Sequence, residues 1–388
     1  MNIGVFFGSR SPEHDISIIT GQLIISTLRK LGHKVTPVYL DKDGDWNVGE
    51  ELGSLKFFQQ FPLPKRSKFV LDLQSSNGKM VFASVGLLKK RYEIELAFPA
   101  FHGMNGEDGT IQGLFEIFNL PYVGCDVVSS AVTMDKILTK QLYEKLGIPT
   151  AKFLFYSTRE WQKNKSAIMN EASKFRWPLF VKPAKLGSSI GIAKAKNPKE
   201  LEEAIEVAAH YGERFLVEET VENLMDVTCA VLGNDDASPS LLQESVFESE
   251  LFSYDEKYLK DGGAQLGNAQ QNIIIPARLD DKTTSEIRNL AVEIFKKFGC
   301  SGIARVDFLY NKQTEQYFAN EINTMPGTLY HHLWKASGME LEEVVTALLK
   351  LAQEKHQQRN SYISTFESSL LDSTKSIKLQ IRDDKPNP

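Results

Sequence analysis

The start of the chain constrains the fold most, because a strand, a loop, a helix and a second strand follow one another there. Residues 3–7 form a short apolar run that ends at Gly8. Ser11-Pro12 favours a helix start, since serine is a common N-cap and proline fits the first helical position. Gly32 suits the end of that helix, near residue 31. With residues 33–40 as the next strand, this order predicts a parallel sheet whose first loop lies at the edge where ligands collect.

Length, charge and cysteine content narrow the class of protein. A chain of 388 residues indicates two or three structural units. The net charge of −5 and the lack of a basic block argue against nucleic acid as the main partner. Three widely spaced cysteines without metal-ligand spacing favour a reducing compartment. The first residues lack signal-peptide features, and no run approaches the ~20 apolar residues of a membrane span. We therefore expect a cytoplasmic protein with no membrane or nucleic-acid partner.

The pattern along the chain predicts an α/β protein with an α+β character in its C-terminal part. We expect an N-terminal α/β unit over residues 1–124, containing a buried strand at 94–101. A central unit over 125–214 should begin with one helix over 127–146 and then alternate strands and helices. A third unit over 215–360 is rich in strands, with helices near 280–298 and 341–353. The polar residues 361–388 form a tail.

The strongest cluster of polar residues lies on a predicted hairpin of residues 303–310 and 316–322. If the turn centres on Thr314, Asp307 faces Glu321 and Arg305 faces Asn323, all on one side of the hairpin. Two carboxylates and an amide oxygen form the kind of site that Mg²⁺ prefers when it also binds phosphates. The apolar neighbours Val306, Phe308, Phe318 and Ile322 should be buried on the other side. An ordinary half-exposed hairpin with an ion pair remains the alternative.

A second candidate site joins an apolar strand to a loop of small residues. Lys182 ends the strand, and Gly187, Ser188, Ser189 and Gly191 follow it. Small residues let backbone N–H groups approach phosphate oxygens, and the lysine supplies positive charge. The spacing matches neither the Walker nor the dinucleotide-binding pattern. A Gly/Ser loop alone is more often a simple turn, so its weight comes from the downstream carboxylates.

Three further segments end in polar residues at predicted strand ends. Residues 215–217 run into Glu218 and Glu219, with Asp226 nearby, and could bind an adenine and its ribose. Glu13 falls in the first turn of its helix and could bind a substrate ammonium group. His102 opens a loop with three glycines directly after a buried strand. For these segments, ordinary strand ends, helix-dipole stabilisation and a glycine-rich turn are the alternatives.

Together these segments, in this order, resemble the D-alanine–D-alanine ligases of the ATP-grasp superfamily. The resemblance covers roughly residues 2–355 and rests on motifs that are specific in combination. They are His102-Gly103 with Gly106-Glu107-Asp108-Gly109 and Ile111-Gln112-Gly113, Pro121-Tyr122-Val123-Gly124, Met134-Asp135-Lys136, Val181-Lys182-Pro183, Arg305-Val306-Asp307, and Glu321-Ile322-Asn323-Thr324-Met325-Pro326-Gly327. It implies an ATP-grasp fold preceded by an N-terminal parallel-sheet domain, with ATP gripped between the last two units.

The resemblance also implies roles for matching positions. The implied ATP-binding residues are Lys136, Lys182, Ser188, Ser189, Glu218, Glu219, Asp226 and Lys257, with Asp226 standing where a glutamate is usual. The implied ligands of Mg²⁺, or of Mn²⁺, are Asp307, Glu321 and Asn323. The implied substrate-binding residues are Glu13, His102, Gly327 and His332. The implied catalytic residues are Glu13, Ser188, Arg305 and Tyr258, where Tyr258 links the closing loop to Glu13 and Ser188.

The implied reaction joins two D-alanine molecules for peptidoglycan synthesis. A carboxylate attacks the γ-phosphate of ATP, and the second amine attacks the resulting D-alanyl phosphate, with release of ADP and phosphate. Arg305 and the Gly327 N–H would stabilise the oxyanion. The small-molecule partners are D-alanine and ATP, and a homodimer is the family's usual assembly.

The sequence departs from the family pattern after Gly327. The family usually has a longer stretch there, with a serine that helps to bind the carboxylate of the second substrate, and His332 aligns best with that serine. The segment 260–268 is longer than usual. A second substrate other than D-alanine, such as D-lactate, D-serine or another amino acid, is therefore the alternative. A nucleotide-binding regulator without catalysis is a further alternative, which the retained Arg305 and Asp307 oppose.

Overall fold

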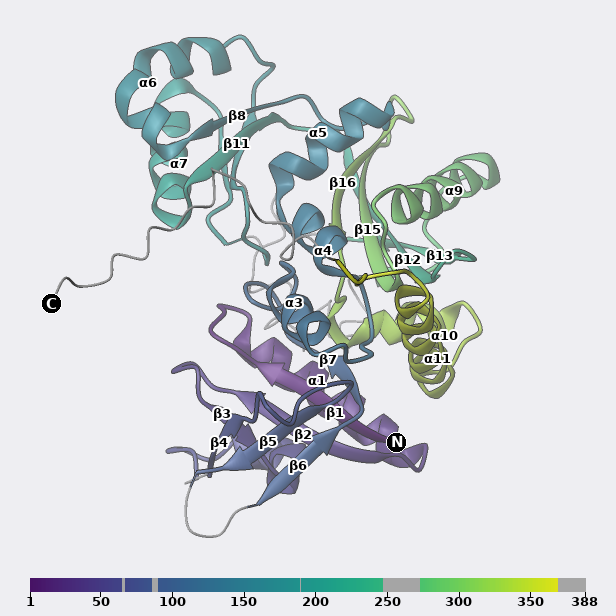
Figure 1. Cartoon of the computed structure of the whole chain (residues 1–388). Coiled ribbons are helices and arrows are strands. Elements are labelled where there is room, and N and C mark those ends of the chain that lie inside the picture. Colours follow the sequence, from purple (N-terminus) through teal and green to yellow (C-terminus); the bar gives the residue numbers. More distant parts are fainter. Residues whose placement is uncertain (65–66, 86–89, 189, 247–272, 369–388) are drawn as a thin grey trace, which may run out of the picture.

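Over the residues that it describes, the computed structural model has three β-sheets that follow one another along the chain (Figure 1). It describes residues 1–64, 67–85, 90–188, 190–246 and 273–368. No helix in these ranges combines the length and the apolar character that crossing a bilayer requires.

The first sheet has seven strands in the order β6-β5-β4-β3-β2-β1-β7. Its strands are β1 Asn2–Gly8, β2 Lys34–Leu40, β3 Trp46–Val48, β4 Lys68–Leu71, β5 Met80–Ser84, β6 Arg91–Ile94 and β7 Leu96–Pro99. β1 pairs in parallel with β2 and β7, whereas the pairs from β2 to β6 are antiparallel. The predicted parallel sheet is thus its β2-β1-β7 part. The strand predicted over 94–101 is divided between the end of β6 and β7.

The helices of this first part are α1 His14–Lys30 and α3 Thr110–Ile117, with the short turns η1 Glu50–Gly53 and α2 Leu55–Phe58. The predicted helix start at Ser11-Pro12 is wrong. Glu13 occupies the N-cap of α1 without a side-chain capping bond. The Ser11 hydroxyl instead accepts from the Glu13 N–H at 3.1 Å and donates to the His102 carbonyl at 2.8 Å. Ser11 therefore joins two loops and does not cap the start of the helix.

The helix predicted over residues 127–146 is broken at Asp135 into α4 Val127–Met134 and α5 Lys136–Leu146. Asp135 has an extended backbone, and its carboxylate accepts from the backbone N–H groups of Ile137 and Leu138. It also forms an ion pair with Arg214. A capping aspartate at this point begins a new helix, so periodicity alone could not reveal the break.

The second sheet has four antiparallel strands in the order β10-β9-β11-β8. They are β8 Phe153–Ser157, β9 Leu179–Pro183, β10 Ala193–Ala195 and β11 Arg214–Glu219. Helices α6 Thr158–Ala172 and α7 Pro198–Tyr211 cover it (Figure 1), with Trp161 and Phe215 in the shared core. The expected unit boundary between residues 214 and 215 cuts β11 from this sheet. The sheet itself runs to Glu219.

The third sheet has five strands in the order β14-β13-β12-β15-β16, all antiparallel. They are β12 Leu224–Gly233, β13 Ser238–Ser245, β14 Ile273–Ile274, β15 Gly302–Asn311 and β16 Tyr317–Asn323. Helix α9 Asp281–Lys297 packs on it through residues such as Ile287 and Phe295. After β16 follow η4 Gly327–Tyr330, α10 His331–Ala336 and α11 Leu341–Asn360, which is longer than predicted.

The two ends of the chain share one apolar core. Ile3 of β1 and Leu28 of α1 are buried in the same cluster as Leu333, Val345 and Leu348 of α10 and α11. An ion pair between Lys30 and Glu342 lies at the edge of this contact. The first sheet and the third are therefore held together by the C-terminal helices, with the central sheet beside them (Figure 1).

Candidate functional site

The predicted hairpin is formed by β15 and β16, and its register is the expected one from Arg305 to Asp307. Asp307 pairs with Glu321, and Arg305 pairs with Asn323. Because paired residues and residues two apart share a face of a sheet, these four side chains lie on one side. Val306 lies on the opposite, buried side. The hairpin thus collects two carboxylates, an amide and a guanidinium on one face.

A bulge interrupts this hairpin directly after the pair of Asp307 and Glu321. Phe308 pairs with Ala319, so Asn320 is the extra residue of β16. Ala319 is fully buried, whereas Phe318 pairs with Leu309 and is only partly buried. The prediction that Phe318 is buried with Val306 is wrong, because one extra residue reverses the alternation of the strand before it.

Arg305 is the main partner of Asp307. Its Nε lies 2.8 Å from Oδ1 of Asp307, and its Nη2 lies 2.6 Å from Oδ2. The Thr228 hydroxyl donates to Oδ1 at 2.9 Å, and the Asn323 amide nitrogen donates to Oδ2 at 3.2 Å. Arg305 Nη2 also lies 3.7 Å from Glu321. Asn323 thus turns its amide nitrogen to Asp307, which leaves its amide oxygen outside this contact.

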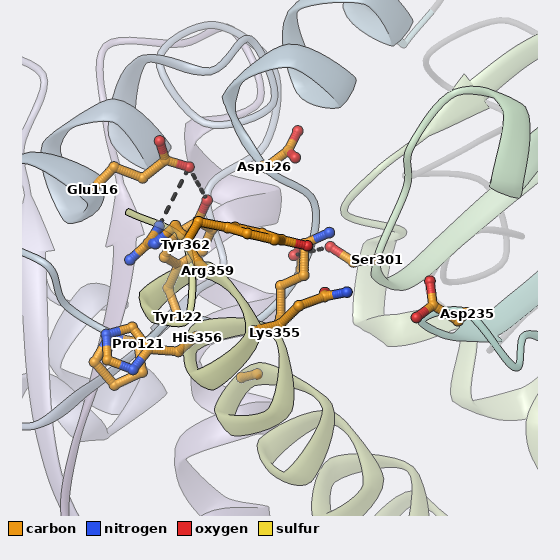
Figure 2. Close-up of a pocket in the computed structure, with 13 residues that line it drawn as sticks. Glu116, Pro121, Tyr122, Asp126, Asp235, Ser301, Lys355, His356, Arg359 and Tyr362 are labelled. Atoms are coloured by element: carbon orange, nitrogen blue, oxygen red, sulfur yellow. Dashed lines mark hydrogen bonds and ion pairs between the residues drawn. The ribbon is translucent and has the colours of Figure 1, made fainter. Parts of the chain in front are cut away.

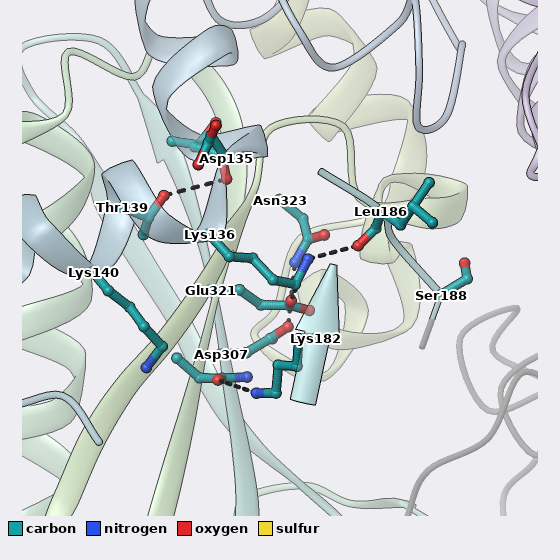
Figure 3. A network of polar contacts seen from close by, with 12 residues as sticks. Asp135, Lys136, Thr139, Lys140, Lys182, Leu186, Ser188, Asp307, Glu321 and Asn323 are labelled. Carbon is teal, nitrogen blue, oxygen red and sulfur yellow. Dashed lines mark hydrogen bonds and ion pairs between the residues drawn. The ribbon is translucent and has the colours of Figure 1, made fainter. Parts of the chain in front are cut away.

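Lys136 reaches the hairpin from the first residue of α5 (Figure 3). Its Nζ donates to the Leu186 carbonyl at 2.6 Å and lies 3.8 Å from a Glu321 oxygen. The helix break at Asp135 makes Lys136 the start of a new helix beside the loop after β9. A cation from α5, the loop and the carboxylate of Glu321 therefore meet at one point.

A buried ion cluster lies between the central and third sheets, formed by Glu218 with two lysines. Lys140 of α5 lies 3.0 Å from one Glu218 oxygen, and Lys182 of β9 forms an ion pair with the other. Lys182 is also 3.5 Å from the bulge residue Asn320. Burial by itself would raise the pKa of Glu218, but the two ammonium groups bring it down to about 2. The carboxylate is therefore ionised, and Lys182 is held next to the hairpin.

The other two acids predicted to bind adenosine lie in different places. Glu219 points to the face of its sheet opposite Glu218, where it accepts from the Arg176 N–H at 3.1 Å. The structure thus does not group the Glu219 side chain with Lys182. Asp226 of β12 pairs with Leu309 and so shares a sheet face with Asp307. Asp226 is placed on the side of the hairpin that carries the polar cluster.

Glu13 meets the loop after β9 from the N-terminal unit. The Ser188 hydroxyl donates to the Glu13 carboxylate, and both residues are buried. Two glycines allow this approach. A Cβ atom on Gly187 would stand 2.9 Å from Oε2 of Glu13, and one on Gly103 would stand 2.5 Å from it. The close packing explains why glycines flank the carboxylate on both sides.

His102 and Glu107 face the C-terminal part of the chain. Thr20 Oγ1 lies 2.8 Å from Nε2 of His102. Burial and the nearby positive charge of Arg305 lower the pKa of His102 to about 4, so its ring is neutral. Glu107 accepts from the Gly103 N–H at 2.7 Å and from the Met325 N–H at 3.2 Å. Burial and the charge of Glu13 raise the pKa of Glu107 to about 8.

The chain after β16 has an unusual backbone. Thr328, Leu329 and Tyr330 follow Gly327, and their φ angles of 50°, 56° and 51° fall in the left-handed region. Such angles are costly for residues other than glycine and cluster at functional sites. The Tyr330 ring lies 5.1 Å from the guanidinium of Arg305. The strained turn therefore packs directly on the arginine of the hairpin.

His332 lies at the start of α10, beside this turn. Its Nε2 is 2.6 Å from Oε1 of Gln243, and its ring centre is 4.8 Å from that of Tyr330. Burial is the main cause that lowers the pKa of His332 to about 4. Tyr330 thus stands between Arg305 and His332, which places His332 on the same side of the third sheet as the polar cluster.

A cavity of about 40 Å³ marks where the units meet. Its lining includes Glu13 and Glu107 from the N-terminal unit, Lys136 and Gly187 from the central part, and Glu321 and Asn323 from the hairpin. Residues that are distant in sequence are thus brought together. The predicted site residues Ser189, Lys257 and Tyr258, and the segment 260–268, lie outside the described residues.

A second cavity of about 340 Å³ lies at the end of α11 (Figure 2). Tyr122 donates to Glu116 at 2.7 Å, and Arg359 lies 3.4 Å from the same Glu116 oxygen. Lys355 and Asp235 also line it. None of the predicted site residues in the described ranges contributes to this lining. These contacts join α11 to the N-terminal unit rather than forming part of the polar cluster.

The oxygen donors of the hairpin fit a divalent ion that is bound together with phosphates. Within the described ranges, no three His, Cys, Asp or Glu side chains form a metal site by themselves. Asp307, Glu321 and Asn323 provide two carboxylates and an amide oxygen, the hard donors that Mg²⁺ and Mn²⁺ accept. A protein that supplies few ligands and leaves the others to phosphate is the usual arrangement for Mg²⁺.

Several residues of the cluster were not predicted from the sequence. Lys140 follows Lys136 by four positions and lies on the same face of α5, so helical spacing could have indicated it. Thr20 follows Glu13 and Ser17 on one buried face of α1, a polar stripe that helical spacing also reveals. Glu107 belongs to the glycine-rich motif after His102, but the motif alone assigned it no role. Gln243 carries no local signal, because only tertiary packing brings it to His332.

Comparison with known proteins gives a consistent result over nearly the whole chain. Residues 2–125 match the family model described as the D-ala D-ala ligase N-terminus, and residues 142–350 match that of the D-ala D-ala ligase C-terminus. The chain is 38% identical over 356 residues to a D-alanine--D-alanine ligase of Thermosipho melanesiensis, covering 92% of this chain and 94% of the relative.

Solved structures of similar proteins agree with this fold. The D-alanine-D-alanine ligase from Coxiella burnetii superposes with a TM-score of 0.78 at 30% identity, covering 93% of this chain and 96% of that one. The VanG D-Ala:D-Ser ligase from Enterococcus faecalis superposes with a TM-score of 0.76 at 32% identity, covering 90% of this chain and 99% of that one.

Proposed function

The chain belongs to the D-alanine–D-alanine ligase family, and we infer that it joins two molecules of D-alanine with ATP as the energy source. It is an ATP-dependent carboxylate–amine ligase of the ATP-grasp fold, and ATP and Mg²⁺ are its cofactors. The product is the dipeptide that peptidoglycan synthesis uses. The observation that carries this proposal is the meeting of Glu13, Lys136 and Glu321 at one cavity, with Asp307 paired to Glu321 in the hairpin.

ATP lies between the central sheet and the third sheet in this proposal. Lys136 and Lys182 contact its phosphates, and the loop at Ser188 and Ser189 closes over them, together with Lys257. Glu218 orients Lys182 through their ion pair. Adenosine is held near Glu219 and Asp226. Asp307, Glu321 and Asn323 would hold Mg²⁺, which would supply positive charge to offset that of the transferring phosphoryl group.

The two substrates bind on the side of the N-terminal unit. Glu13 binds the ammonium group of the first D-alanine, and the carboxylate of that D-alanine attacks the γ-phosphate to give D-alanyl phosphate and ADP. The amine of the second D-alanine then attacks the acyl carbon, and phosphate leaves. Arg305 and the Gly327 N–H stabilise the oxyanion of that step. His332 contacts the second carboxylate, His102 supports the first substrate, and Tyr258 completes the closed site.

The test uses the full chain with ATP, Mg²⁺, D-lactate and a pool of D- and L-amino acids, with products identified by mass spectrometry. We expect D-alanyl-D-alanine as the main product, with one phosphate released for each dipeptide. If D-alanyl-D-serine or D-alanyl-D-lactate is the main product, the second substrate is not D-alanine, but the family assignment still holds. ATP binding without any turnover would reject the proposed ligase activity and support the alternative of a nucleotide-binding regulator without catalysis. Asp307→Asn, which removes one charged oxygen ligand, is the inactive control.

Three broader expectations belong to this proposal. The protein works in the cytoplasm, where ATP and D-alanine are available, and its partners are these small molecules. It forms a homodimer, which light scattering of the purified chain would test directly. The chain divides into an N-terminal unit, a central unit that begins near residue 125, and a C-terminal unit. The boundary between the last two units is placed after Glu219, the end of β11, instead of after residue 214. Residues 361–388 form the tail.

A further inference from the structure

The turn that follows β16 is held at both ends by residues of the N-terminal unit. At one end, the Met325 N–H donates to Glu107 at 3.2 Å. At the other, the Thr328 N–H donates to Thr20 Oγ1, also at 3.2 Å. Gly327 lies between these two anchors. Residues more than two hundred positions earlier in the chain therefore fix the backbone that carries the Gly327 N–H.

The direction of the hydrogen bonds at Thr20 follows from its two partners. Thr20 is fully buried, so its hydroxyl has only protein groups to contact. The Thr328 N–H can only donate, so the Thr20 oxygen accepts from it. The Thr20 proton is then directed to Nε2 of His102, 2.8 Å away. This makes Nε2 an acceptor and leaves the His102 proton on Nδ1, where a hydrogen bond to the Met325 backbone takes it.

Both ring nitrogens of His102 are thereby used within the protein. The ring connects the Thr20 hydroxyl to the backbone of Met325, and Thr20 connects it to Thr328. The hydrogen bonds thus run from Thr328 to Thr20, from Thr20 to His102, and from His102 to Met325. This chain begins and ends on the turn that contains Gly327. His102 therefore holds this turn through its ring nitrogens, so its proposed support of the first substrate is indirect.

The turn needs such support because its backbone is strained. Thr328, Leu329 and Tyr330 all adopt left-handed φ angles, which residues with a Cβ atom avoid unless the surroundings impose them. A buried N–H group that loses its acceptor is also costly. Without the Thr20 hydroxyl, both effects favour a rearrangement of the turn toward ordinary backbone angles.

We propose that Thr20 is a positioning residue, which sets the orientation of the Gly327 N–H through its hydrogen bonds to Thr328 and His102. The inference rests on the proposed function, in which this N–H stabilises the oxyanion of peptide-bond formation. Thr20 touches neither substrate nor nucleotide in this account. Its loss should impair the second step, the attack of the amine, more than the formation of the acyl phosphate, which then hydrolyses.

The experiment compares Thr20→Ala with Thr20→Ser, two variants of similar size that differ by the hydroxyl. Thr27→Val is the matched control. Thr27 is also buried on α1, but its hydroxyl bonds only to the Leu23 carbonyl of the same helix. We expect the alanine variant to lose at least about tenfold in kcat, with little change in KM for ATP. Phosphate released per dipeptide should rise above one. The serine variant and Thr27→Val should stay close to wild type.

A second readout does not depend on the identity of the substrate. Hydrogen–deuterium exchange of the peptide that covers residues 325–330 reports the opening of the turn. We expect faster exchange in Thr20→Ala than in Thr20→Ser, and no change in Thr27→Val. Equal exchange in the alanine and serine variants, or a phosphate-to-dipeptide ratio of one in both, would overturn the proposal. If the exchange rates differ as expected but the wild-type chain makes no dipeptide, the proposed function alone is refuted.

Discussion

Gly103 lies so close to Glu13 that a Cβ atom at Gly103 would stand 2.5 Å from Oε2 of the carboxylate. The glycine has a φ of 71°, so an alanine there meets both backbone strain and a collision. Glu13 is the proposed contact for the substrate ammonium group. The spacing of these two residues therefore links the glycine-rich loop to substrate affinity.

We predict that Gly103→Ala raises KM for D-alanine at least about tenfold, because the carboxylate must move away from its position. Gly78→Ala is the control, since Gly78 has a similar φ of 67° but a Cβ atom there would meet nothing within 4 Å. Both variants should lose about 1–2 kcal/mol of stability through the left-handed backbone. Steady-state kinetics with thermal unfolding separates the two effects. An unchanged KM in Gly103→Ala would contradict the placement of the substrate at Glu13.

The buried cluster of Glu218, Lys140 and Lys182 predicts a pH-dependent stability. The folded-state pKa of Glu218 is lowered to about 2 from an ordinary value of 4.5. The stability that the carboxylate contributes is therefore fully present above pH 4.5 and is lost as the pH falls toward 2. We expect Glu218→Gln to cost about 3–5 kcal/mol at pH 7, because two buried cations lose their partner.

Urea unfolding at pH 7 and at pH 3 measures this effect. Glu219→Gln, which changes the neighbouring and more exposed carboxylate, should cost less than about 1 kcal/mol at pH 7. The difference between the two variants should shrink at pH 3. A Glu218→Gln protein as stable as wild type at pH 7 would show that the lysines do not depend on this carboxylate.

Glu321→Gln should impair the reaction through the metal rather than through the fold. The amide keeps the size of the side chain but removes the charge opposite Asp307. We expect kcat to fall roughly 100-fold or more, since a metal ion contributes several kcal/mol of charge stabilisation. The Mg²⁺ concentration for half-maximal rate should rise. Glu293→Gln, on the exposed face of α9, is the control. Near-normal rates at saturating Mg²⁺ would remove Glu321 from the proposed ligands.

His332 should act as a neutral group throughout the physiological range. Burial lowers the pKa of His332 to about 4, so the ring carries no charge above pH 5. We expect KM for the second D-alanine to be constant between pH 6 and 8, except for titration of the substrate itself. His332→Ala should raise that KM about tenfold and leave KM for ATP unchanged. His210→Ala, on an exposed face of α7, is the control. A KM that doubles or more as the pH rises through 6.5 would indicate a charged ring.

The sequence was sufficient to predict the two strands of the hairpin and their register at Arg305 and Asp307. Alternation along residues 303–310 and 316–322 indicated that Asp307 and Glu321 pair on one face. This worked because successive side chains of a strand point to opposite faces of the sheet. The same reasoning failed for Phe318. The bulge at Asn320 adds one residue, and no local pattern distinguishes it from an ordinary polar position in a strand.

Tertiary contacts account for the other differences. The carboxylate of Asp135, which caps the second helix, is also held by an ion pair with Arg214 from a distant strand. Ser11 accepts from the Glu13 N–H and donates to the His102 carbonyl, so it joins the two loops while Glu13 takes the N-cap position. Gln243 and Thr20 become part of the site only when the sheets pack together. Each of these effects depends on a partner that is remote in sequence, which periodicity cannot report.

Ile3 and Leu348 share one apolar core, but Ile3 is synthesised near the start of translation and Leu348 near its end. At typical rates of synthesis, roughly 20–70 s separate the emergence of the two residues from the ribosome. During this interval, the apolar sides of β1 and α1 lack their final cover, which is a period of exposure to chaperones and aggregation. Thr20 cannot meet Thr328 until the first 328 of the 388 residues have been made. The enzyme is therefore expected to gain its activity in a single late event rather than unit by unit.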